Sequence, residues 1–156
     1  MDSSRCKLLQ SMPVFGGVSC ETVMFLIERA TEMTLNKGEF FFHEGDSATS
    51  MFVLESGAVS VLKVRDGKTH LVRELGEGDC FGEMALLDLY PRSSSIMATS
   101  CCHAIEVGQA SLFELYRKNL EQFTIIQMNI GREISRRLRL TDEQLFYNSS
   151  GKASIS

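Results

Sequence analysis

The sequence predicts an α+β protein that is mainly β: a β-roll or jelly-roll barrel with flanking N-terminal helices and a long C-terminal lid helix. Between residues 33 and 107, turns that contain glycine recur every seven to twelve residues, as in closed or double-sheet β architectures. Apolar residues follow helical spacing before and after this region. We therefore expect one domain over residues 1–147, with N-terminal helices in 3–31, the roll in 33–107 and C-terminal helices in 111–147.

The composition is ordinary for a globular domain. The 156 residues are 44% hydrophobic and 23% charged, enough to bury one core. The net charge of −4 argues against a protein that binds nucleic-acid phosphates. No apolar run approaches the roughly 20 residues of a membrane span, and the N-terminus lacks the apolar core of a secretion signal. We expect a cytoplasmic protein with neither a nucleic acid nor a membrane as its partner.

The cysteines and histidines form no recognisable motif. The cysteines are odd in number and contain no C-x-x-C pair, and two neighbours in a strand would point to opposite faces. Reduced thiols that pack as small hydrophobes are therefore expected at Cys6, Cys20, Cys80, Cys101 and Cys102. The histidines, His43, His70 and His103, are scattered singly, so the sequence predicts no metal site.

Two helices are expected before the roll. Residues 3–11 can form a short helix. Ser19 is a plausible N-cap for a second one, with Glu21 in the first turn, where a negative charge is favoured. The second helix has one apolar face, formed by Val23, Leu26, Ile27 and Ala30, and it is expected to pack on the β core.

The roll itself contains five strand-like segments between turns. The glycine of each turn is expected to supply a positive φ angle or a bend. The segments are Glu39–His43, Met51–Leu54, Ala58–Val64, Thr69–Leu75 and Ser94–Glu106.

Two helices are expected after the roll. Ser111 and Glu114 have the spacing of a capping box, which predicts a helix to about Arg117. A second start at Asn119 predicts a long helix to about Tyr147. Its apolar stripe comprises Phe123, Ile126, Ile130, Ile134, Leu138, Thr141 and Leu145, in which the threonine is the one polar member. The polar segment 148–156 is predicted to be disordered.

Two further features mark this long helix. Gly131 costs roughly 1 kcal/mol relative to alanine in a helix. A residue with this cost can indicate that a second helix approaches closely, so the sequence suggests a homodimer through the C-terminal helix. The arginines of one face, Arg132, Arg136 and Arg139, are interpreted as solvated.

The segment 81–95 carries the most specific functional signal. Gly82 allows a tight turn or a close approach to a ligand, and Glu83 is a fixed acceptor. Met84–Leu89 reads as a short helix whose first N–H groups favour an anion. Arg92 is a planar donor suited to phosphate, and a run of serines follows it. Together they describe a sugar-phosphate site, whereas the simpler alternative is a surface ion pair between the glutamate and the arginine.

This segment resembles the phosphate-binding cassette of cyclic nucleotide-binding domains, which occur in protein kinase A regulatory subunits, cyclic-nucleotide-gated channels and catabolite activator proteins. The matching residues are Phe81, Gly82, Glu83, Ala85, Leu86, Pro91 and Arg92. With the glycine turns and the C-terminal helix, the resemblance covers residues 12–147.

The resemblance implies roles for individual residues. Glu83 would hold the ribose 2′-hydroxyl, and Arg92 would pair with the cyclic phosphate beside the helix start at Met84 and Ala85. Ser93 would contact the phosphate or a guanine amino group. Thr141 and Asp142, in the helix that covers the base in catabolite activators, are candidates for contacting the base.

The expected function is that of a non-enzymatic cyclic nucleotide sensor that signals by repositioning its C-terminal helix. cAMP is favoured over cGMP because that helix resembles the catabolite-activator type. The chain ends too early for a helix-turn-helix, so a stand-alone module that acts on an unknown effector protein is expected, or else an excised or degenerate one. The alternatives are a nucleotide-free scaffold for protein–protein interaction and a cupin-like metal enzyme, against which the scattered histidines argue.

Overall fold

Two four-stranded antiparallel sheets form a β-roll in the computed structural model, which describes residues 3–153, with side chains from 3 to 149. The sheet orders are β1-β8-β3-β6 and β2-β7-β4-β5. This architecture confirms the predicted fold class. The strands are β1 (Thr31–Leu35), β2 (Phe40–Phe42), β3 (Ser50–Ser56), β4 (Val59–Arg65), β5 (Lys68–Leu75), β6 (Cys80–Phe81), β7 (Ser95–Ala98) and β8 (Cys102–Gly108).

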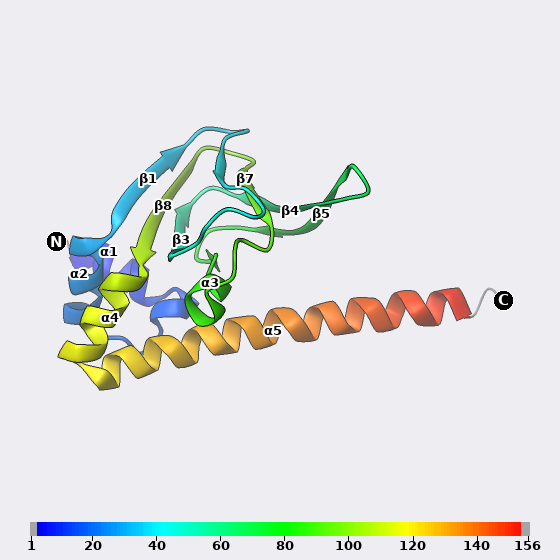
Figure 1. Ribbon diagram of the computed structural model, residues 1–156. Coiled ribbons are helices and arrows are strands. Elements are labelled where there is room, and N and C mark those ends of the chain that lie inside the picture. The colour runs from blue at the N-terminus through cyan, green and yellow to red at the C-terminus, as the bar shows by residue number, and fades with distance from the viewer. Residues whose placement is uncertain (1–2, 154–156) are drawn as a thin grey trace.

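The helices gather at one end and one side of the roll. Figure 1 shows α5 passing beneath the roll and α3, with α1, α2 and α4 grouped near its start. None of the helices in residues 3–153 combines the length and the apolar character that a membrane crossing requires. The helices are α1 (Ser3–Gln10), the 3₁₀ turn η1 (Pro13–Phe15), α2 (Cys20–Arg29), α3 (Met84–Asp88), α4 (Gln109–Lys118) and α5 (Leu120–Ala153).

Two hydrophobic cores hold these elements together. Inside the roll, four phenylalanine rings pack with centroids between 5.0 and 6.2 Å apart: Phe41, Phe42, Phe52 and Phe81. The second core joins the N-terminal helices to β3, β8 and the first turns of α5. The predicted face of α2 lies in it, because Val23, Leu26 and Ile27 are buried there.

The local signals at two helix starts are confirmed. The Oγ of Ser19 accepts a hydrogen bond from the backbone N–H of Thr22 at 3.2 Å, so this serine is the N-cap of α2. The Oδ1 of Asn119 accepts from the N–H of Gln122 at 3.2 Å, which caps α5 in the same way.

The predicted capping box at Ser111 is wrong, because α4 starts two residues earlier. Gly108 is its N-cap, and the N–H of Gln109 donates to the carbonyl of Thr49 at 2.8 Å. Tertiary contact with the roll therefore determines where this helix starts. Glu114 pairs instead with Arg29 of α2, at 2.9 Å.

The strand prediction needs three changes. The segment Ser94–Glu106 divides into β7 and β8, because the turn between them is tied to the β3–β4 turn: Ala58 N–H donates to Ser100 Oγ at 3.0 Å. Two strands, β1 and β6, were not predicted. The predicted role of the turn glycines is confirmed, since φ is positive at Gly38, Gly45, Gly57, Gly67 and Gly78.

α5 is longer than predicted. It continues to Ala153, so residues 148–153 are helical rather than part of a disordered tail, and residues 154–156 lie outside the described chain. The stripe residues that lie in the second core or pack against it are Phe123, Ile126, Ile130 and Ile134. Leu138 and Leu145 are 59% and 61% exposed, because the helix has by then left the second core.

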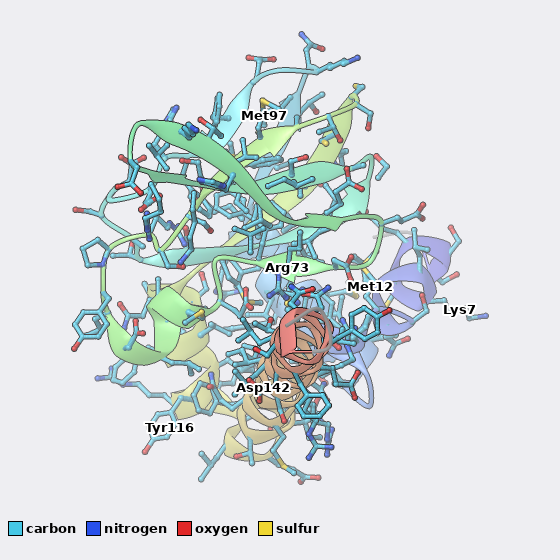
Figure 2. All side chains as sticks on the ribbon, turned by 90° about the vertical axis from the view of Figure 1, so that its right-hand side faces the viewer. Lys7, Met12, Arg73, Met97, Tyr116 and Asp142 are labelled. Atoms are coloured by element: carbon cyan, nitrogen blue, oxygen red, sulfur yellow. A yellow bond between two sulfur atoms is a disulfide. The ribbon has the colours of Figure 1, made fainter. Side chains whose placement is uncertain are left out.

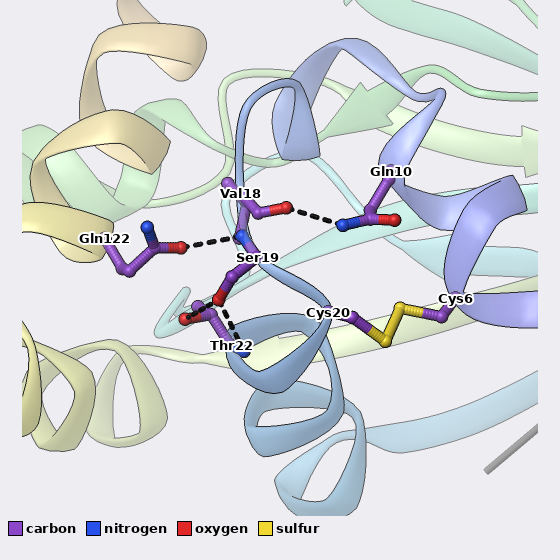
Figure 3. Close-up of a disulfide and its surroundings, with 7 residues drawn as sticks. All are labelled: Cys6, Gln10, Val18, Ser19, Cys20, Thr22 and Gln122. Atoms are coloured by element: carbon purple, nitrogen blue, oxygen red, sulfur yellow. Dashed lines mark hydrogen bonds between the residues drawn. A yellow bond between two sulfur atoms is a disulfide. The ribbon is translucent and has the colours of Figure 1, made fainter. Parts of the chain in front are cut away.

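The prediction of reduced thiols is wrong for two of the cysteines. Cys6 in α1 and Cys20 at the start of α2 form a disulfide (Figure 3). The three remaining cysteines have free thiols: Cys80 and Cys102 are buried and Cys101 is exposed.

Candidate functional site

A left-handed glycine begins the predicted site. Strand β6 ends at Phe81, and Gly82 then adopts φ +79° before Glu83, which precedes α3 without a side-chain capping bond. A Cβ atom at Gly82 would lie 2.5 Å from Nη1 of Arg92. Glycine is therefore required here both by the backbone angle and by the arginine packed against it. Helix α3 covers Met84–Asp88 and ends at Leu89, as the sequence predicts.

Arg92 is buried, with 7% of the residue exposed, and its guanidinium is held on one edge. Nη1 donates to the carbonyl oxygens of Ser50 and Gly82 at 2.8 and 3.1 Å, and Nη2 donates to Ser50 Oγ at 3.3 Å. The guanidinium carbon lies 4.1 Å from the centre of the Phe42 ring, a cation–π distance. These contacts fix the position of the positive charge.

The other edge of this guanidinium has no protein partner. Nε of Arg92 is buried without a hydrogen-bond acceptor, and within residues 3–149 no carboxylate lies at ion-pair distance from it. Burial lowers the pKa of Arg92, although an arginine remains charged in proteins. A buried cation with an open donor edge can bind an anion such as a phosphate oxygen.

Glu83 is also buried, with 5% of the residue exposed, but it faces α5 rather than Arg92. Its Oε1 accepts from Nη1 of Arg137 at 3.0 Å, and Nη2 of the same arginine donates to the Cys80 carbonyl at 2.6 Å. Burial raises the pKa of Glu83, and the charge of Arg137 opposes that rise. The alternative of a surface ion pair between Glu83 and Arg92 is therefore wrong.

Arg137 was not identified from the sequence. It belongs to a helix with several arginines, and nothing in the spacing distinguishes it from its neighbours except that it lies one turn before Thr141. In the structure it is the direct link between α5 and the loop that contains Glu83.

A second group of residues lies between β5 and α5. Oγ1 of Thr141 donates to the Arg137 carbonyl at 3.0 Å and accepts from Nη2 of Arg73 at 3.3 Å. The sequence analysis also missed Arg73, whose pKa is lowered by burial and by the nearby charge of Arg137. Figure 2 places Arg73 between the roll and α5, whereas Asp142 lies on the side of α5 away from the roll.

These residues line a cleft of about 280 Å³. Arg73, Val72 and Leu75 of β5 form one wall, and Arg137, Leu140 and Thr141 of α5 form the other. Because the cleft offers apolar surface beside several donors, it can hold a flat polar ring.

The structure brings some of the predicted site residues together. Gly82 lies against the buried Arg92, Glu83 is buried before α3 and faces α5, and Ala85 is buried within α3. Ser93 and Met84 are exposed. Thr141 lines the cleft, and Asp142 lies outside it.

His103 is not as isolated as the sequence suggests. Its ring lies with Glu32 and Glu55 in a group whose potential ligand atoms are within 4.8 Å of one another. The guanidinium of Arg5 forms ion pairs with both carboxylates. A cation of the protein itself already occupies the space between these two acids, so the group is accounted for as an ion-pair network.

Comparisons with known proteins agree with this geometry. The family profile described as "Cyclic nucleotide-binding domain" matches residues 32–119, more than half of the chain. The Cyclic AMP receptor protein of Thermus thermophilus is 27% identical over 88% of this chain and 62% of its own length. The cAMP-dependent protein kinase type II regulatory subunit of Drosophila melanogaster is 33% identical over 60% of this chain and 25% of its own length. The chain thus spans between a quarter and about three fifths of these two relatives.

Solved structures show the same fold. The Thermus thermophilus Catabolite Activator Protein aligns with a TM-score of 0.75 at 27% identity, over 88% of this chain and 63% of its own. A cyclic nucleotide-binding domain from Methylobacillus flagellatus aligns with a TM-score of 0.81 over 92% of this chain and 81% of its own, at 19% identity, which supports the fold alone.

Proposed function

The chain is a member of the cyclic nucleotide-binding domain family, and on that premise we propose that it is a sensor that binds a cyclic nucleotide without catalysing a reaction. The observation that carries the proposal is the buried guanidinium of Arg92. It has an edge without an acceptor beside the start of α3, and the buried carboxylate of Glu83 follows Gly82 directly.

These positions suggest how the ligand binds. The cyclic phosphate would accept from Nε of Arg92 and from the first N–H groups of α3, which lack acceptors within the helix. The ribose hydroxyl would donate to Oε2 of Glu83, because Oε1 is already paired with Arg137. The base would enter the cleft between β5 and α5, against Thr141.

The favoured ligand is cAMP. α5 resembles the helix that covers the base in catabolite activators, and Thr141 lies in the cleft, where its hydroxyl can reach a base edge. Proteins whose names specify cAMP are among the relatives matched across most of this chain, such as the Cyclic AMP receptor protein of Thermus thermophilus.

One observation favours cGMP as a second candidate. Arg73 reaches into the same cleft. A guanine presents two acceptors, N7 and O6, on one edge, and arginine is the side chain that most often donates to that pair. Adenine presents N7 beside an amino donor on the same edge, so it can accept only one of those bonds.

Movement of α5 would transmit the signal. Arg137 and Thr141 of this helix meet the site directly, so a bound nucleotide that competes for Glu83 or fills the cleft changes the preferred position of the helix. The extent of the shift is limited by the difference in ligand affinity between the two helix positions.

We also propose that α5 forms a homodimer. Gly131, Leu138 and Leu145 follow one another at intervals of seven residues, the repeat of paired helices. Both leucines are mostly exposed, and a Cβ at Gly131 would meet nothing within 4 Å. The glycine lies in a groove of about 530 Å³ that Met128, Ser135 and the arginines Arg132, Arg136 and Arg139 also line, so a second helix in this groove would have to offer acceptors to those arginines.

Light scattering tests the dimer. Leu138→Glu should convert a dimer into a monomer, because it buries a charge in the helix pair. Leu71→Glu, at an exposed position of β5, is the matched control and should leave the mass unchanged. A monomeric mass for the unaltered chain, with and without nucleotide, would refute the homodimer.

Calorimetric titration with cAMP and, separately, cGMP tests the sensor. The protein should bind one nucleotide per chain, and Arg92→Ala should abolish measurable binding. Arg65→Ala, which removes an exposed arginine paired with Glu44, should bind normally. Absence of heat with both nucleotides, in folded and nucleotide-free protein, would instead favour the scaffold function.

A further inference from the structure

The segment between Cys6 and Cys20 holds the first half of α5 in place. Nδ2 of Asn129 in α5 donates to the carbonyl oxygens of Val14 and Gly16 at 3.0 and 2.9 Å. The N–H of Ser19 donates to Oε1 of Gln122, also in α5, at 2.8 Å (Figure 3). These polar contacts of α5 therefore all fall on the 13 residues that the disulfide closes into a loop.

Apolar contacts also join this segment to α5. Met12, Val14, Phe15 and Val18 of this segment are buried, in the same core as Ile126 and Ile130 of α5. Because Asn129 is itself 6% exposed, loss of its two acceptors would leave a buried amide unsatisfied. The position of α5 thus depends on the loop remaining closed against it.

The disulfide has one accessible end. Cys6 is buried, whereas Cys20 is exposed at the first position of the ten-residue helix α2. A helix N-terminus stabilises a thiolate, so the released Cys20 thiol would be reactive toward further exchange. A reductant can therefore reach the bond without unfolding of the domain.

We propose that the Cys6–Cys20 disulfide is a reversible redox switch that determines how firmly residues 7–19 hold α5. A dithiol reductant attacks Sγ of Cys20, the S–S bond breaks, and Cys6 leaves as a thiolate that takes up a proton. The second thiol of the reductant then resolves the mixed disulfide. Two electrons pass from the dithiol, which becomes a disulfide, and both cysteines become thiols.

The expected size follows from loop closure. Cross-linking a loop of about 15 residues changes the equilibrium for opening that segment on the order of a hundredfold. Reduction should therefore increase local opening of residues 7–19 and of the α5 residues that they contact, while the sheet formed by β2, β7, β4 and β5 is unaffected.

Hydrogen exchange on the full chain, without nucleotide, tests the switch directly. Mass analysis of the non-reduced protein should first show the Cys6–Cys20 linkage. Addition of dithiothreitol should then increase exchange on the order of ten- to a hundredfold around Val14 and Asn129, with no change in β4 and β7. Free thiols at both Cys6 and Cys20 in protein purified without reductant, or identical exchange in both states, would overturn the proposal.

Three variants separate the switch from general effects of a reductant. Cys6→Ala with Cys20→Ala should show the reduced pattern permanently and respond no further to dithiothreitol. Cys101→Ala, which removes the exposed free thiol, should respond like the unaltered chain. Asn129→Ala should loosen α5 with the disulfide intact, and reduction should then add less than it does in the unaltered chain. A full response in the double alanine variant would contradict the assignment.

The consequence for ligand binding rests on the proposed function. Because α5 supplies one wall of the cleft, reduction should weaken cAMP binding about tenfold, and the double alanine variant should match the reduced protein. If exchange responds but neither state binds a nucleotide, the switch stands and the sensor function fails. If both states bind equally, control of the ligand by this switch is refuted.

Discussion

The two parts of the proposed nucleotide site are constructed in different ways. The part proposed for the phosphate, the phosphate side, comes from one continuous segment, with Gly82, Glu83 and Arg92 positioned by β6, α3 and the neighbouring Ser50. The part proposed for the base, the base side, requires Arg73 and Thr141, which are 68 residues apart and meet only because α5 lies against β5. The phosphate side is therefore built mainly by the roll, with one contact from α5 through Arg137 and Glu83, whereas the base side depends on where that helix lies.

The largest expected effect concerns the phosphate side. Arg92→Lys retains the charge but loses the flat edge that can donate two parallel bonds. Each charge-assisted bond contributes roughly 1.5–3 kcal/mol, so titration should show affinity for both nucleotides falling at least about a hundredfold.

The control for this change is Arg65→Lys, at an exposed ion pair on β4, which should bind as the unaltered protein does. A lysine variant of Arg92 that retains normal affinity would show that the phosphate lies elsewhere.

Gly82→Ala should have the next largest effect. The new Cβ would lie 2.5 Å from Nη1 of Arg92, so the guanidinium must move, and we expect affinity for both nucleotides to fall about tenfold. The positive φ should also lower the free energy of unfolding by about 1–2 kcal/mol.

Gly67→Ala provides a matched comparison, because it has φ +73° but no atom within 4 Å of the added Cβ. It should lose similar stability in chemical denaturation and retain nucleotide affinity. Equal loss of affinity in the two variants would mean that backbone strain alone explains the effect.

Arg73→Ala should distinguish the base side from the phosphate side. Loss of a donor to the base changes discrimination by roughly 1–3 kcal/mol, so the ratio of cGMP to cAMP affinity should fall about tenfold while the cAMP affinity changes little. Arg139→Ala, an exposed arginine of α5, should not change the ratio. An equal loss for both nucleotides would assign Arg73 to the phosphate instead.

The smallest expected effect concerns the pH dependence of folding stability at Cys80, the first residue of β6. Burial raises the pKa of the Cys80 thiol to about 12 from its ordinary value of 9.0. As pH rises, this thiol therefore ionises in the unfolded chain before it ionises in the folded protein. The contribution of Cys80 to the free energy of unfolding is fully present below pH 9 and is lost progressively toward pH 12.

Denaturation at pH 8 and pH 10 measures this effect. The comparison uses two proteins, Cys101→Ala and Cys101→Ala/Cys80→Ala. The first should have the higher free energy of unfolding, and the difference between the two should shrink by about 1 kcal/mol from pH 8 to pH 10. The shared substitution removes the exposed thiol that would otherwise exchange with the disulfide. A constant difference would mean that Cys80 is accessible to water in the folded protein.

The contrast between the two sides also explains what the sequence could predict. Gly82, Glu83, α3 and Arg92 lie within eleven residues, so their order and spacing are visible in the sequence. The caps at Ser19 and Asn119 were predictable for the same reason, because each requires only residues of its own helix.

The residues that were missed depend on distant neighbours. Arg73 occurs in a strand whose other positions are largely exposed. It lines a cleft only because α5 lies beside this strand. Arg137 resembles the solvated arginines around it. The Cys6–Cys20 pairing likewise follows from the proximity of two helices, which no spacing rule provides.

One further consequence follows from the length of α5. At 1.5 Å per residue, Thr141 lies about 18 Å along the axis from Asn129, and Tyr147 lies about 27 Å from it. A rotation of about 5° at Asn129 would therefore displace Thr141 by about 1.6 Å and Tyr147 by about 2.4 Å. If α5 rotates about the N-terminal loop as proposed, a rearrangement too small to break the hydrogen bonds of the helix itself would become a displacement of atomic size at its exposed tyrosine.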